Sequence, residues 1–118
     1  MRRQDVAVQD DGTTSGVVVI ASTLALEDGT DLSTRFVMER EHAGWVADEL
    51  DKAGDAWGYP GADETLGDDH LLVFGGGRDE QPIINLQNVR GGEREPGEYW
   101  IGMTQDVAEK LRDLLRNL

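Results

Sequence analysis

The sequence predicts a two-layer α+β domain with two helices on one face of a largely antiparallel five-stranded sheet. Three observations support this fold class: short segments rich in β-branched residues, glycine-containing hairpin linkers between them, and two amphipathic stretches. The expected element order is β-β-α-β-β-β-α. Residues 17–118 are assigned to this single domain, and the polar residues 1–16 to a flexible N-terminal tail with at most a short edge strand at residues 6–8.

The first two strands form a predicted hairpin across Glu27, Asp28 and Gly29, with Gly29 in the left-handed conformation. Leu26 then pairs with Thr30, and the residue numbers of every cross-strand pair add to the same value. In this register one face collects the large apolar side chains Val18, Ile20, Leu24, Leu26, Phe36 and Met38. A two-residue turn would mix both faces, so the pattern favours the three-residue loop.

The remaining elements follow from periodicity and capping. Residues 42–53 place their alanines, Val46 and Leu50 on one helical stripe, and residues 105–118 form a second amphipathic helix with Thr104 as N-cap. Three further strands are expected at residues 70–75, 82–89 and 98–103. Residues 55–69 show no clear element, and loops of this length are often functional.

Composition excludes several classes of function. The formal net charge of −13 argues against binding to nucleic-acid phosphates. The chain has no cysteine, which excludes thiolate chemistry and fits a cytoplasmic location. No apolar run is long enough for a membrane span. The acidity itself has three competing explanations: solubility, a high-salt source, or a surface for a basic partner.

Familiar catalytic and metal-binding patterns are not matched. The acidic residues around Gly29 lack the ligand spacing of a calcium loop, and the FGGGRDE run at residues 74–80 lacks the Lys-Ser or Lys-Thr of a phosphate loop. His42 lies near Glu39 and Glu41 in sequence, but no further ligand is evident, so an exposed histidine is expected. No cofactor, metal site or catalytic residue is therefore predicted.

Aromatic residues within an acidic segment give the predicted partner site. Trp45 lies on the polar side of the first helix, where either the following loop or a partner protein would cover it. Residues 48–69 contain eight carboxylates and one lysine. We expect a non-enzymatic regulator, inhibitor or immunity-type protein that engages a basic partner through helix 42–53 and loop 55–69. The predicted contact residues are Trp45, Asp48, Glu49, Trp57, Tyr59, Asp63 and Glu64.

Two other hypotheses concern different surfaces. A small ligand-binding domain or enzyme would use a cleft between the sheet and loop 55–69, with Asp69, His70 and Arg78 as its polar residues. A homodimer would use the sheet face away from the helices, where a half-apolar surface is expected from residues such as Val17, Val19, Arg35, Val37 and Glu39. A mixed, solvated face is the alternative to the dimer.

Overall fold

The computed structural model describes residues 3–10, 17–25, 29, 31–54, 58–67, 69–78, 81–89 and 100–118. The elements in chain order are β1 (Arg3–Asp10), β2 (Val17–Ala25), β3 (Asp31–Glu39), a 3₁₀ turn η1 (Arg40–His42), α1 (Ala43–Lys52), β4 (Ala62–Leu66), β5 (Asp69–Arg78), β6 (Gln81–Asn88), β7 (Trp100–Met103) and α2 (Gln105–Arg116).

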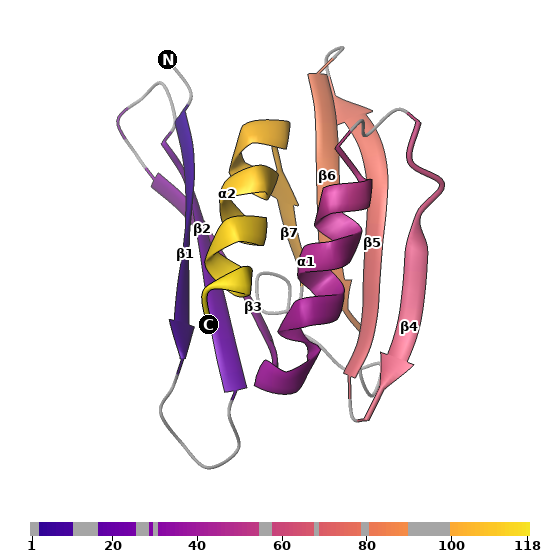
Figure 1. Ribbon diagram of the computed structural model, residues 1–118. Helices are drawn as coiled ribbons and strands as arrows, with labels where there is room; N and C mark the ends of the chain where they lie inside the picture. Colours follow the sequence, from indigo (N-terminus) through magenta and orange to yellow (C-terminus); the bar gives the residue numbers. More distant parts are fainter. Residues whose placement is uncertain are drawn as a thin grey trace.

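The fold is two-layer α+β, as predicted, with both helices on one side of the strands (Figure 1). The strands form two antiparallel sheets, in the orders β1-β2-β3 and β4-β5-β6-β7. β3 also contacts β6 and β7. The described residues therefore form seven strands, two more than expected. They form two sheets instead of the single sheet that was predicted, and the division lies where β3 meets the second sheet.

The predicted hairpin register is confirmed along β2 and β3. Val18 pairs with Met38 and Ile20 with Phe36, and the same sum of residue numbers holds from the Val17–Glu39 pair to the Ala25–Asp31 pair. Gly29 has a φ of 89°, in the left-handed region. The Leu26–Thr30 pair lies outside the described residues. Phe36 and Met38 are fully buried, so the apolar face of the hairpin is the face under the helices.

Both helices bury the stripes that their periodicity indicates. Ala43, Val46, Ala47, Leu50 and Ala53 of the first helical stretch are all buried. In α2, Val107, Ala108, Leu111 and Leu115 are buried, whereas Leu118, the last residue of the predicted helix, follows the helix end and is 40% exposed. Neither described helix combines the length and apolar composition needed to cross a membrane.

Two strands lie within segments for which no full strand was predicted. β1 runs from Arg3 to Asp10 and pairs with β2 along its whole length, so these residues are not a flexible tail. β4 lies inside the predicted loop 55–69 and pairs with β5 as the outermost strand of its sheet. Both are edge strands in which polar residues outnumber apolar ones, so pairing with the neighbouring strand is important for holding them in place.

The side chain of Gln4 fastens β1 to the start of α2. Its Nε2 donates to the carbonyl of Gly102 at 2.7 Å, and its Oε1 accepts from the amide of Thr104 at 3.0 Å. The Gln4 side chain thus makes one hydrogen bond to a backbone carbonyl and one to a backbone amide in the segment that leads from β7 into α2. Val6 of the same strand is buried in the core.

Gln4→Ala is therefore expected to lower the free energy of unfolding by about 1–2 kcal/mol, because two hydrogen bonds to the backbone are lost. Gln9→Ala is the matched control, since Gln9 is an exposed residue of the same strand and should change stability by less than about 0.5 kcal/mol. Urea unfolding measures both variants. If both variants lost the same free energy of unfolding, the two hydrogen bonds of Gln4 would not contribute to stability.

Candidate functional site

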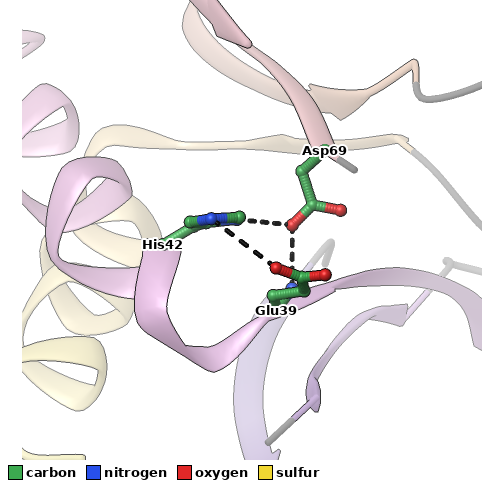
Figure 2. Close-up of side chains that lie close together, drawn as sticks. All are labelled: Glu39, His42 and Asp69. Carbon is green, nitrogen blue, oxygen red and sulfur yellow. Dashed lines mark hydrogen bonds and ion pairs between the residues drawn. The ribbon is translucent and has the colours of Figure 1, made fainter. Parts of the chain in front are cut away.

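Three ionisable side chains from two distant parts of the chain converge at the start of α1 (Figure 2). Glu39 ends β3, and His42 ends the single 3₁₀ turn that follows. A 3₁₀ turn has three residues, so side chains three positions apart lie on the same side of it. Asp69, the first residue of β5, approaches this pair from the second sheet.

Asp69 is the centre of the cluster and is only 1% exposed. Its Oδ2 accepts from the backbone amide of Glu39 at 2.8 Å and lies 2.7 Å from His42 Nδ1. Its Oδ1 accepts from Asn88 Nδ2 at 3.0 Å. Burial acts to raise the pKa of Asp69, but the hydrogen bonds from Glu39, His42 and Asn88 outweigh it and hold the pKa below its ordinary value. The side chain is thus a buried, ionised carboxylate.

Asn88 extends this network into the backbone of both sheets. The side chain is fully buried, and its Nδ2 also donates to the carbonyl of Val37 in β3 at 2.9 Å. Its Oδ1 accepts from the backbone amide of His70 in β5 at 3.2 Å. The polar groups that face one another where β3 meets β5 and β6 are therefore hydrogen-bonded through two side chains.

His42 corrects the sequence interpretation, which placed it in solvent. Its exposed fraction is 7%, because the start of β5 packs against the turn that carries the ring. A buried imidazole is tolerated here since Nδ1 has the Asp69 carboxylate as its partner. The other ring nitrogen, Nε2, lies 3.7 Å from Glu39 Oε2 and 3.5 Å from Glu41 Oε1.

The carboxyl of Glu39 lies in a crowded acidic environment. Desolvation, the Asp69 charge and contact with Glu41 raise its pKa above the ordinary value, against the opposing effect of His42. The sequence places Glu39, Glu41 and His42 close together but shows no further group that would complete a site. Asp69 lies 27 positions from His42, and no spacing rule connects a strand–helix turn to the start of a later strand.

The predicted partner residues around Trp45 only partly come together. Trp45 is half-buried and packs against the core. The Tyr59 hydroxyl donates to Glu49 Oε2 at 2.7 Å, and Lys52 Nζ contacts Glu49 Oε1 at 3.1 Å. Burial, and then the neighbouring Glu49 carboxylate, raise the pKa of Tyr59. Glu49 is therefore a buried hydrogen-bonding group rather than an exposed contact residue.

The other predicted partner residues point in different directions. Asp48 faces α2, where its carboxylate lies 3.6 Å from Arg116. Asp63 and Glu64 are consecutive in β4 and so project to opposite faces of the sheet. Asp63 lies 3.6 Å from His70 on the face away from the helices, and Glu64 lies on the helix side. Trp57 lies outside the described residues.

The alternative ligand site is not assembled by β5. Asp69 faces the buried cluster, whereas His70, the next residue of the strand, is half-exposed on the opposite face. Arg78 is at the far end of the same strand, roughly 30 Å from Asp69 at the usual rise per residue; its side chain lies outside the described part. These residues do not converge on one pocket.

The sheet face away from the helices carries one large exposed aromatic side chain. Trp100 is 46% exposed, and its Nε1 donates to Asn85 Oδ1 at 3.0 Å. Val37 and Glu39 are half-buried, while the side chains of Val17, Val19 and Arg35 lie outside the described part. A homodimer through this face stays a prediction.

No protein-family model matches this sequence, and no curated protein is significantly similar to it.

Asp69→Asn is expected to destabilise the protein by about 2–4 kcal/mol, because an amide cannot accept from Glu39, His42 and Asn88 at once. Asp63→Asn removes the same charge from an exposed position whose contact with His70 is loose, and should cost less than about 0.5 kcal/mol. Urea unfolding at neutral pH compares them. A similar loss in both variants would contradict the role assigned to the buried network.

The Tyr59–Glu49 hydrogen bond predicts a loss of stability at high pH. Because the pKa of Tyr59 is raised in the folded chain, the contribution is complete below the ordinary tyrosine pKa of about 10 and is lost as the pH rises above it. Tyr59→Phe should remove this part of the pH dependence. Urea unfolding of the parent protein and of Tyr59→Phe between pH 8 and pH 11 gives the free energy of unfolding as a function of pH. If the slope against pH were the same in both proteins, the assignment to Tyr59 would be wrong.

Proposed function

We propose that this protein is a non-enzymatic binding protein that engages a basic partner protein through α1 and residues 58–67, which include β4. The expected setting is the cytoplasm, since the sequence has no cysteine. A regulator, inhibitor or immunity-type factor is the class of protein that this mode of binding suits. This is the helix 42–53 and loop 55–69 region of the sequence prediction, and β4 is the part of that loop that forms a strand.

The observation that carries the proposal is the imbalance of exposed charge in this region. Among the described residues from 41 to 67, one exposed side chain is basic, Lys52, and five are acidic: Glu41, Asp48, Asp51, Asp63 and Glu64. A surface of one sign attracts a partner of the opposite sign and orients it before contact.

Contacts between α1 and α2 indicate which part of this region is the partner surface. Arg112 lies 3.0 Å from Asp51, and Arg116 lies near both Asp48 and Asp51. The acidic groups of α1 that face α2 are therefore balanced within the protein. β4 is the edge strand of its sheet and lies beyond α1, away from α2 (Figure 1). Its exposed Asp63 and Glu64 project to the two sides of this edge, so a basic partner gains most attraction at β4.

Half-buried aromatic side chains support a protein partner over a small cation. Trp45 and Tyr59 are each partly exposed while packing against the core. Aromatic groups held in this way offer contact area without much loss of side-chain freedom, and Trp and Tyr are enriched where binding energy concentrates. The acidic groups would then supply orientation and the aromatic groups adhesion.

A short lysine- and arginine-rich peptide can stand in for the basic partner and tests the location of the surface. In an NMR titration of the labelled protein, we expect amide shifts to change in α1 and residues 58–67, and the effect to weaken as salt is added. The variant Asp63→Asn/Glu64→Gln should bind about three- to tenfold more weakly, in line with two exposed charge contacts.

The matched control is Glu109→Gln/Asp113→Asn, which removes two exposed carboxylates from α2 and should leave peptide affinity nearly unchanged. Equal weakening in the two variants would indicate that only net charge matters. Shift changes centred on Trp100 instead would move the contact to the opposite face of the sheet. Either result would overturn the proposed surface.

A further inference from the structure

The imidazole of His42 is oriented so that Nδ1 is committed to the Asp69 carboxylate and Nε2 faces the carboxylates of Glu39 and Glu41. Both oxygens of Asp69 accept hydrogen bonds from other groups, the Glu39 amide and Asn88. An acceptor of this kind, 2.7 Å from His42 Nδ1, places the ring proton on Nδ1. In the neutral ring, Nε2 then presents a lone pair.

Two further electron-rich atoms face this lone pair. Glu39 Oε2 lies 3.7 Å from Nε2, and Glu41 Oε1 lies 3.5 Å from it. Donor atoms bound to a tetrahedral zinc ion at about 2.0–2.1 Å are separated by about 3.3 Å. Each carboxylate oxygen therefore lies within about 0.5 Å of the separation from Nε2 that a shared ion requires. The His42 side chain is 8% exposed, so little water is available around the ring to separate them.

We propose that His42 Nε2, Glu39 and Glu41 bind a divalent transition-metal ion of the zinc type, with Asp69 orienting the imidazole. Imidazole nitrogen is a ligand for zinc and its neighbours in the first transition row, whereas calcium and magnesium favour sites built of oxygen. Metal-binding histidines commonly donate their second N–H to a carboxylate, which sets the ring orientation and strengthens the ligand. Asp69 occupies that position.

The surroundings of the site allow an ion to enter from one side. Gly67, with a φ of 56°, lies against the cluster, where a Cβ would be 3.5 Å from Glu39 Oε2 and 3.8 Å from His42 Nε2. Gly67 thus closes one side of the cluster with backbone alone. The Glu41 side chain is 75% exposed, so solvent reaches the cluster on the side of Glu41.

A protonated ring is the competing arrangement. If Nε2 carried a proton, it would donate to the same two carboxylates, and the cluster would be an internal ion pair that needs no metal. The two arrangements differ in how they respond to zinc. In the first, zinc binds tightly to the Nε2 lone pair, whereas in the second the Nε2 proton occupies that position and zinc has no defined site.

Calorimetric titration of the chelator-treated full chain with zinc alone distinguishes them. We expect one ion per chain and a rise in the melting temperature with zinc. Glu41→Gln should weaken binding at least about tenfold, the scale seen even for partners of metal ligands, and should still fold because its side chain is exposed. In ¹⁵N spectra of the histidine rings, zinc should shift Nε2 of His42.

His70→Gln and Glu109→Gln are the controls, since they remove the other histidine and an exposed distant carboxylate; both should bind zinc like the parent protein. The proposal is overturned if zinc binds no tighter than about millimolar, or if His70→Gln weakens binding as much as Glu41→Gln. Equal affinity for calcium or magnesium would also overturn it, because the carboxylates alone would then bind the ion and the imidazole would not be a ligand.

Discussion

The buried carboxylate of Asp69 joins the two sheets and the first helix. Asp69 is the first residue of β5, and its carboxylate accepts hydrogen bonds from the amide of Glu39 at the end of β3 and from Asn88 at the end of β6. Asn88 in turn bonds the carbonyl of Val37. An unpaired polar group at such a junction would cost several kcal/mol, so these two side chains allow the backbone of β3 to meet the second sheet in a buried place. The position and direction of α1 follow, because its first turn is held at His42.

Acidic side chains have three different physical roles in this molecule, so the net charge describes no single surface. Asp69 and Glu49 are buried and act as hydrogen-bond acceptors. Asp48 and Asp51 are exposed but face the arginines of α2. Asp63 and Glu64 lie on the edge strand β4, where charge also discourages pairing with another sheet edge. The proposed partner surface depends on the third group, and the proposed metal site on the junction that Asp69 maintains.

The parts of the fold that were predicted correctly are those in which neighbouring residues carry the signal. The β2–β3 register follows from the alternation around Phe36 and Met38, since a slip by one residue would expose them. The stripe of α1 follows from helical spacing in the same way. β1 and β4 were not recognised as full strands because polar residues within them, such as Gln4 and Asp63, interrupt any alternating apolar pattern. Such edge strands are defined by the neighbours with which they pair.

The sequence by itself determined which faces of the hairpin and helices are buried, because local periodicity and hydrophobic burial act over a few residues. It also determined that the protein is acidic and lacks thiol chemistry. Only the tertiary structure decided that His42 is buried beside Asp69, and that Glu49 is bonded to Tyr59 instead of facing a partner. Those contacts join separate elements, and a carboxylate has the same appearance in a sequence whether it ends up buried, paired or exposed.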